Sequence, residues 1–168
     1  MGIPSLSIML HEVIKLMYHA RCKDVIFIRL GTCGGIGYPG GTLVITEGAV
    51  DGLLRPYLEL HVLGEVVQRP AVLDKKLAKE LKAVGEEQLP DYNIVMGKTM
   101  CTYDFYEGQG RLDGAFCEYK EEDKMKHLEY LRTQGVTNIE MESLAFAAMC
   151  NYSGIKGLLY YDVQLFWN

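Results

Sequence analysis

The strongest constraint on the fold of this chain is the alternation of β-branched apolar runs with segments of helical periodicity. Apolar residues recur at helical spacing over residues 7–19, which predicts an amphipathic helix with its apolar stripe in the core. The apolar run at residues 25–28 predicts a strand, and residues 42–50 predict a second one. This order indicates the α/β class, and 168 residues with 49% hydrophobic content suffice for a single domain with a sizeable core.

The same alternation continues toward the C-terminus, after a poorly patterned connection at residues 51–70. The further expected elements are strands at residues 60–67, 93–99 and 139–141, helices at residues 74–84 and 121–133, and a helical run at residues 144–150. The lysine-rich face of the helix at residues 74–84 is interpreted as a solvated face. Neither an internal repeat nor a linker divides the sequence, so one domain is expected over residues 1–168.

The segment CTYDFYEGQGRLDG, residues 101–114, places an aromatic ring beside an amide and a guanidinium. Phe105 offers a stacking surface, Gln109 can donate and accept along one edge of a base, and Arg111 can donate to a second carbonyl. The glycines between them allow the backbone to come close to a ligand. One interpretation is a plain Gly-rich turn between two elements, and the other is a site for a flat pyrimidine base.

Two further segments supply groups that suit the rest of a nucleoside. Residues 28–37 follow the first predicted strand and are interpreted as a Gly-rich loop, where Arg29, the Thr32 hydroxyl and free backbone N–H groups suit an anion such as phosphate. The second segment, NIEMES at residues 138–143, is predicted to be a short strand that leads into a helix. A carboxylate at such a strand end can accept hydrogen bonds from a ribose diol.

Three motifs follow one another along the sequence: the pattern R-x-G-T-x-G-G-I-G in the predicted loop, then FYEGQGRLDG in the base segment, then IEMES in the ribose segment. This combination and order are typical of one family. From about residue 2 to about residue 154 the sequence resembles the uridine phosphorylases, the pyrimidine branch of the nucleoside phosphorylase family. The resemblance implies a three-layer α/β fold with a central mixed sheet flanked by helices. It also implies the reversible conversion of uridine and phosphate to uracil and ribose 1-phosphate in pyrimidine catabolism and salvage. Phosphate is then a co-substrate, and no metal or organic cofactor is implied; the family forms homo-oligomers, including dimers.

The resemblance also implies a role for each matching residue. Phosphate and ribose would be contacted by Arg29 and Thr32, in a loop shaped by Gly31 and Gly34. The ribose would be held by Met141 and Glu142, with Glu140 flanking them. The implied catalytic residues are Arg29, Thr32, Gln109 and Arg111, and the implied substrate-binding residues are Gly31, Gly34, Phe105, Glu140, Met141 and Glu142. Because an amide and a guanidinium read two carbonyls, a pyrimidine is favoured over a purine.

The sequence also departs from the family. Family members carry a substantial portion before the point where Met1 stands, and the sequence after Gly157 drifts from the pattern and lacks the closing helix and a basic residue expected there. The chain is therefore expected to be incomplete at both ends, with an open sheet that self-associates. Two hypotheses remain: an active uridine phosphorylase, or a catalytically silent homologue that binds nucleoside weakly or pairs with a complete subunit.

Composition excludes several other classes of protein. Lys and Arg total 17 against 22 Asp and Glu, and the resulting net charge of −5 provides no basic field for nucleic acid or an anionic membrane. The first 20 residues hold no apolar run long enough for a signal peptide or a membrane span, so a cytosolic location is expected. The fit of residues 35–40 to G-x-G-x-x-G is rejected as a dinucleotide site because Pro39 and β-forming residues follow instead of a helix.

The cysteines and histidines do not suggest a metal site. The five cysteines show no C-x-x-C pairing, and their odd number suits a reducing compartment. Cys33 falls within the predicted anion loop, where a depressed thiol pKa is conceivable, but a buried structural role is favoured. His11 and Glu12 begin a zincin-like pattern, yet Lys15 stands where the second histidine belongs, so metal hydrolysis is not supported.

Overall fold

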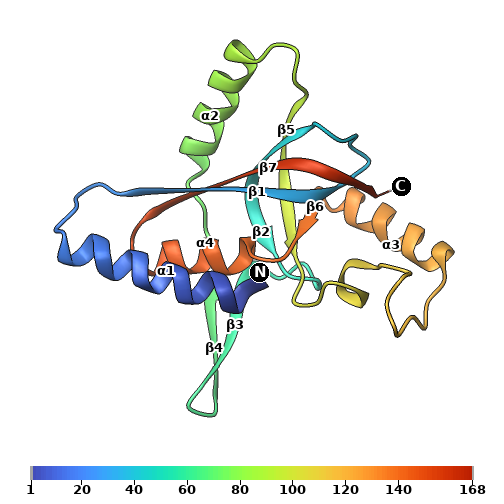
Figure 1. Ribbon diagram of the computed structural model, residues 1–168, viewed down its shortest axis with the longest axis horizontal. Coiled ribbons are helices and arrows are strands. Elements are labelled where there is room, and N and C mark those ends of the chain that lie inside the picture. Colours follow the sequence, from blue (N-terminus) through green and yellow to red (C-terminus); the bar gives the residue numbers. More distant parts are fainter. Residues whose placement is uncertain (1, 168) are drawn as a thin grey trace.

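Five strands form the centre of the computed structural model, which describes residues 2–167 (Figure 1). They pair in the order β1–β6–β5–β2–β7, and β7 returns to β1, so the sheet closes into a barrel. The strands are β1 (Ile26–Ile36), β2 (Leu43–Val50), β5 (Ile94–Cys101), β6 (Val136–Glu140) and β7 (Lys156–Trp167). The sheet is mixed as expected, because β1–β7, β2–β5 and β5–β6 are parallel pairs and β1–β6 and β2–β7 are antiparallel.

Closure of the barrel corrects the expected open sheet. An open sheet leaves two unpaired edges, whereas each of these five strands pairs with two neighbours along part of its length. The pairing that closes the ring is that of β7 with β1, which runs along the whole of β1 from Ile26 to Ile36. Residues 156–167 therefore form a central strand, and this strand includes the segment after Gly157 that was expected to depart from the family pattern.

Helices surround this barrel on several sides. Helices α1 (Gly2–His19) and α4 (Ser143–Tyr152) lie side by side, α2 (Lys75–Gln88) projects from the far side, and α3 (Glu121–Thr133) lies beside the end of β7 (Figure 1). A separate hairpin of β3 (Tyr57–Val62) and β4 (Glu65–Pro70) extends beyond α4. Among the residues that the structure describes, none of the helices is both long and apolar enough to cross a membrane.

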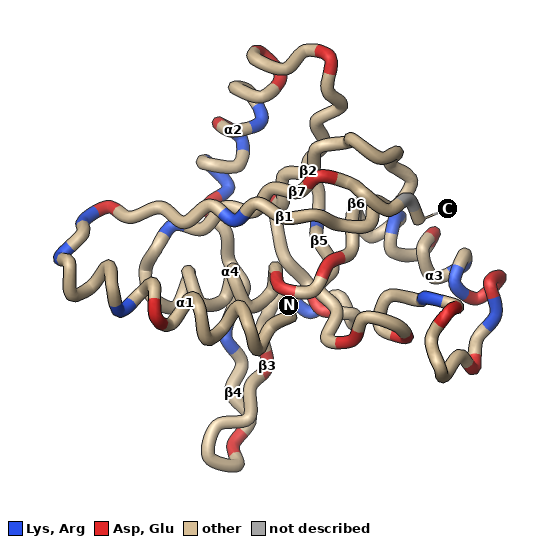
Figure 2. Tube along the Cα trace, in the orientation of Figure 1, with Lys and Arg blue, Asp and Glu red and all other residues tan. Residues whose placement is uncertain are grey.

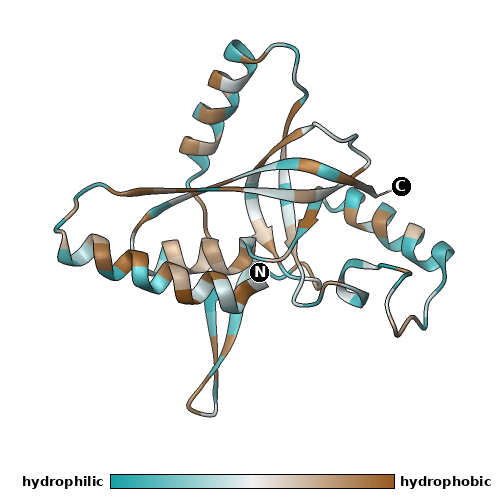
Figure 3. Ribbon diagram, in the orientation of Figure 1, coloured by the Kyte–Doolittle hydropathy of each residue, from teal (hydrophilic) through white to brown (hydrophobic). Residues whose placement is uncertain are grey.

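Helix α4 is the centre of the main core. Every residue from Ser143 to Cys150 is buried, because the helix packs between the barrel and α1, whose Leu6 and Leu10 join the same apolar cluster. Such burial on all sides matches a sequence that is apolar around the whole helix. Charged residues concentrate instead on α2, α3 and the connections (Figure 2), whereas apolar residues run along α1 and β1 (Figure 3).

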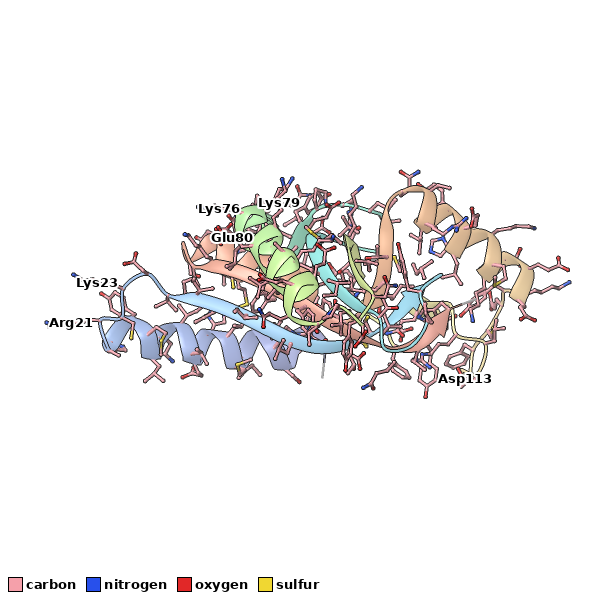
Figure 4. All side chains as sticks on the ribbon, turned by 90° about the horizontal axis from the view of Figure 1, so that it is seen from above. Arg21, Lys23, Lys76, Lys79, Glu80 and Asp113 are labelled. Atoms are coloured by element: carbon pink, nitrogen blue, oxygen red, sulfur yellow. The ribbon has the colours of Figure 1, made fainter. Side chains whose placement is uncertain are left out.

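Most of the predicted helices are confirmed. The helix predicted at residues 121–133 has these bounds, and α2 begins after Asp74, whose carboxylate accepts hydrogen bonds from the N–H groups of Lys76 and Leu77 at 3.0 and 2.9 Å. This is N-capping by an aspartate. Lys76, Lys79 and Glu80 point outward from α2, so its charged face is solvated as predicted (Figure 4). Helix α1 starts at Gly2, earlier than the predicted residue 7.

Two predicted elements are wrong. The strand predicted at residues 60–67 is the hairpin β3–β4, which turns at Leu63 and Gly64, both with positive φ (51° and 88°). The Gly-rich loop predicted after residue 28 is also absent, because β1 continues through it to Ile36. The physical reason is crowding: a Cβ on Gly35 would lie 2.8 Å from a methyl carbon of Val163 on β7, so glycine permits close strand packing here rather than a turn.

Candidate functional site

A cleft of about 200 Å³ opens where β1, β6 and β7 meet the segment after β5. Pockets for drug-sized ligands measure about 300–1,000 Å³, so this cleft suits a smaller group such as one base and part of a sugar. Eight of the predicted site residues line it: Thr32, Gly34, Phe105, Gln109, Arg111, Glu140, Met141 and Glu142. The structure thus brings three segments that are distant in the sequence together around one cleft.

The base-reading segment forms one wall of the cleft. A short 3₁₀ turn, Glu107–Gln109, ends at Gly110 in the left-handed conformation (φ 67°), and this reversal sets Arg111 beside Gln109. The Nε–H of Arg111 donates to Oε1 of Gln109 at 3.4 Å, and the guanidinium carbon lies 4.0 Å from the centroid of the Phe105 ring. Gln109 is buried, whereas Phe105 is partly exposed, so an amide, a guanidinium and an aromatic ring meet at the cleft.

Arg29 is not among the residues that line the cleft. Its Nη2 lies 2.6 Å from Oε2 of Glu142, and its Nη1 lies 3.2 Å from Oε2 of Glu140. The same Nη1 donates to the hydroxyl of Tyr161 on β7 at 2.8 Å. The charge of Arg29 is therefore balanced by two carboxylates, and its guanidinium is not presented to an anion in the cleft as the sequence suggested.

Glu140 is held on both of its carboxylate oxygens. Oε2 accepts the N–H of Glu142 at 2.9 Å, Oε1 accepts the N–H of Ser143 at 2.7 Å, and the side chain is 3% exposed. These donors belong to the start of α4, where the helix dipole favours a negative charge. Burial nevertheless raises the pKa of the Glu140 carboxyl, an effect that Arg29 and the N–H donors oppose. Glu140 thus anchors the turn that carries Met141 and Glu142.

Glu142 is the more exposed of the two carboxylates that line the cleft. Its Oε2 faces Arg29, its Oε1 accepts the backbone N–H of Gly2, and its side chain is 15% exposed. Met141 lines the cleft beside it. A carboxylate in this position can accept hydrogen bonds from a sugar hydroxyl at its exposed edge.

The predicted glycines make room for buried side chains. A Cβ on Gly31, which does not line the cleft, would lie 2.9 Å from Nη1 of Arg29 and 3.0 Å from the Tyr161 ring. A Cβ on Gly34 would lie 1.8 Å from Nε1 of Trp167. Neither glycine has positive φ, and both lie within β1 rather than in the predicted loop, where they permit close packing against β7. Their role in substrate binding stays a prediction.

Four cleft residues were missed by the sequence reasoning: Cys33, Ile139, Gln164 and Leu165. Gln164 and Leu165 come from β7, which was not assigned as an element. The enrichment of residues 158–167 in Leu, Tyr, Val, Phe and Trp was a strand signal that could have found them. Their position at the cleft depends on pairing with β1, which no local pattern indicates.

Cys33 is expected to resist alkylation in the folded protein. Burial raises the pKa of its thiol to about 12, because the charged thiolate is disfavoured away from water. Iodoacetamide at neutral pH should therefore modify the exposed Cys22 and Cys117 and spare the buried Cys33, Cys101 and Cys150. Peptide mass spectrometry measures this, with full labelling in denaturant as the control. Labelling of Cys33 as fast as that of Cys22 would contradict its burial.

Comparison with known families gives a match over most of the chain. The model of the "Phosphorylase superfamily" matches residues 1–159. Human "Uridine phosphorylase 2" is 55% identical over 156 residues, which are 93% of this chain and 49% of that protein. "Inactive uridine phosphorylase B" of Schistosoma mansoni is 42% identical over 94% of this chain and 53% of that protein. The chain thus spans about half the length of the curated relatives that it matches.

A solved structure agrees with the fold. Uridine phosphorylase from Schistosoma mansoni in complex with thymine superimposes with a TM-score of 0.95 at 43% identity, over 98% of this chain and 58% of that one. The same schistosome protein has also been solved with uracil and with thymidine. The mixed sheet with flanking helices predicted from the sequence is therefore confirmed as a part of that fold.

Proposed function

Because the chain belongs to the phosphorylase superfamily, we propose that it acts as a uridine phosphorylase, a pentosyltransferase that converts uridine and phosphate reversibly to uracil and ribose 1-phosphate. The observation that carries this proposal is the convergence of Gln109, Arg111 and Phe105 with Glu142 on one cleft. The identity to uridine phosphorylases supports it, as does the binding of thymine, uracil and thymidine by the schistosome relative.

The cleft supplies groups for the base. The Gln109 amide can donate to one carbonyl oxygen of uracil and accept from N3–H, and Arg111 can donate to the other carbonyl oxygen, while the ring lies against Phe105. As the bond from C1′ to N1 breaks, its electron pair leaves with the base, and uracil becomes negatively charged. Hydrogen bonds from Arg111 and Gln109 strengthen as this charge develops, so they stabilise the transition state more than the bound substrate. Adenine has no carbonyl, and hypoxanthine and guanine have one, so this pair of side chains favours pyrimidine nucleosides.

The other half of the reaction needs ribose and phosphate held together. Glu142 and Met141 would hold the ribose, and Arg29 and Thr32 would contact phosphate, whose oxygen forms the new bond to C1′. In the structure Nη2 of Arg29 and Oε2 of Glu142 form an ion pair at 2.6 Å. A ribose hydroxyl donating to Glu142 and a phosphate accepting from Arg29 can replace this ion pair together. Phosphate and nucleoside binding are then coupled, since each releases the partner that the other needs.

A second candidate is a catalytically silent homologue that binds nucleoside weakly or pairs with a complete subunit. The observation that favours it is the engagement of Arg29, the arginine assigned to phosphate, by the carboxylates of Glu140 and Glu142. A dianion must compete with two carboxylates for this arginine, which weakens its binding.

Phosphate-dependent release of uracil from uridine tests the proposal. We expect release by the purified chain in phosphate buffer, followed by absorbance, and none in a phosphate-free control or with inosine as substrate. The reason for the last expectation is the pyrimidine-reading pair Gln109 and Arg111. If a chain shown to be folded by circular dichroism releases no uracil at any phosphate concentration, the silent homologue is the correct alternative.

The proposed setting is pyrimidine salvage in the cytosol by a self-assembled protein, as the resemblance implies. An exposed apolar surface supports self-assembly: Ile26, Ile28 and Leu30 project from β1 and are 46%, 55% and 71% exposed. Met9 of α1, which is 50% exposed, lines one groove together with these three residues. Contiguous apolar patches of this kind mark interaction sites.

A further inference from the structure

Two aromatic rings lie within cation–π distance of the Arg111 guanidinium. Its Cζ lies 4.0 Å from the centroid of the Phe105 ring and 5.3 Å from the ring of Trp167, the residue at the end of β7. Within residues 2–167, no carboxylate lies within ion-pair distance of Arg111. Its polar side-chain partner is Oε1 of Gln109 at 3.4 Å. The arginine is therefore held by ring faces and an amide rather than by an opposite charge.

Contact with aromatic rings leaves the charge and the N–H donors of Arg111 available to a ligand, whereas a carboxylate partner would occupy them. A carboxylate partner fixes a guanidinium but also occupies its donors and neutralises its charge. Aromatic faces attract the cation through their quadrupoles and leave the N–H groups at its edge free. Arg111 can thus keep its charge for an oxygen of the ligand that becomes negative.

Trp167 is itself fixed in place. It is 9% exposed, lies opposite Ile36 in the pairing of β1 with β7, and belongs to an apolar cluster with Leu128 and Leu131 of α3. Lys124 of α3 places its Nζ 4.5 Å from the same ring, so the indole attracts two cations. The absence of a side chain at Gly34 is what admits the indole, because a Cβ there would lie 1.8 Å from Nε1.

We propose that Trp167 is a positioning residue for base recognition: with Phe105 it forms a two-ring clamp that holds Arg111 toward the cleft. The identity of the recognised base rests on the proposed function, whereas the clamp rests on geometry alone. This assigns a role to a residue of β7 that lies beyond residue 159, where the match to the family model ends.

The first test uses the ligand-free protein. The chain contains one tryptophan, so its ¹H–¹⁵N spectrum holds one indole N–H peak, which belongs to Trp167. We expect Arg111→Gln to move this peak, because the substitution removes a cation from the ring face. Arg21→Gln is the matched control: the same change in charge at an exposed arginine of the loop after α1, which should leave the peak in place (Figure 4). An unmoved peak in Arg111→Gln would overturn the clamp.

The second test measures uracil affinity by calorimetry in a double-mutant cycle. Trp167→Leu should weaken binding about 2- to 30-fold, the range expected for a cation–π contact, and Trp167→Phe should restore most of the loss. In the Arg111→Gln background, Trp167→Leu should have no further effect. An equal loss in both backgrounds would show that Trp167 acts only through the core and would overturn its positioning role.

The two tests separate the clamp from the proposed function. If the wild-type chain binds no uracil but its indole peak responds to Arg111→Gln, the clamp stands and the pyrimidine ligand is wrong. If uracil binds and the indole peak ignores Arg111, the ligand stands and the clamp is wrong. Thermal melts followed by circular dichroism identify any variant that has simply unfolded, and Trp167→Phe is the variant that best preserves the core.

Discussion

Glu140→Ala is expected to lower the free energy of unfolding by about 3–5 kcal/mol, as does removal of one partner from a buried ion pair. The carboxylate is 3% exposed and holds Arg29 together with the N–H groups of Glu142 and Ser143. Its loss leaves two backbone donors at the start of α4, where the helix is buried, without their acceptor. It also removes one of the two carboxylates that balance the buried guanidinium.

Urea unfolding followed by circular dichroism measures this loss. Glu129→Ala is the matched control, because Glu129 pairs with Arg132 at 3.0 Å but both side chains are more than 60% exposed. Exposed pairs contribute about 0–1 kcal/mol, so the control should change stability little. Similar losses for the two variants would refute the view that Glu140 anchors the start of α4.

Gly34→Ala is expected to cost about 1–3 kcal/mol of stability and to displace Trp167. The added Cβ would lie 1.8 Å from Nε1, 2.5 Å from Cδ1 and 2.9 Å from Cε2 of the indole. The ring cannot move aside cheaply, since it packs against Leu128, Leu131 and Ile36 in an apolar cluster. Displacement of the indole should also shift its N–H peak and weaken uracil binding through Arg111.

Gly48→Ala provides the control for Gly34→Ala. Gly48 also lies in a strand, but a Cβ there meets nothing within 4 Å, and its φ is not positive. Replacement of such a glycine reduces the entropy of the unfolded chain and stabilises by about 0.4–1 kcal/mol. The two variants should therefore change the urea midpoint in opposite directions. A Gly34→Ala protein as stable as wild type, with an unmoved indole peak, would contradict the close packing of β1 against β7.

Local patterns predicted the elements whose stabilising contacts lie close in the sequence. The bounds of α3 follow from its acidic first turn and charged helical composition, and the start of α2 follows from the cap at Asp74. The glycines of β1 were misassigned because glycine serves both turns and close strand contacts. The choice between these uses depends on Val163, Tyr161 and Trp167, which lie more than 100 positions away.

The motifs likewise predicted which side chains line the cleft, but not which other residues these side chains bind. Phe105, Gln109 and Arg111 lie near one another in the sequence and were expected to act together. Arg29 was expected to be open to an anion, and its neutralisation by Glu140 and Glu142 depends on contacts that span more than 100 residues. Glu140 resembled a ligand-binding carboxylate, yet its oxygens serve the helix that follows it.

The sequence by itself determined the α/β class, the family and the side chains available for binding a nucleoside, because these depend on residue types and short spacings. The tertiary structure decided that the sheet closes into a barrel, that β7 supplies Gln164 and Leu165 to the cleft, and that Trp167 lies against Arg111. The physical reason is the separation along the chain of the residues that interact. Periodicity and capping act over a few residues, whereas strand pairing, charge compensation and ring stacking join segments whose separation along the chain carries no local signal.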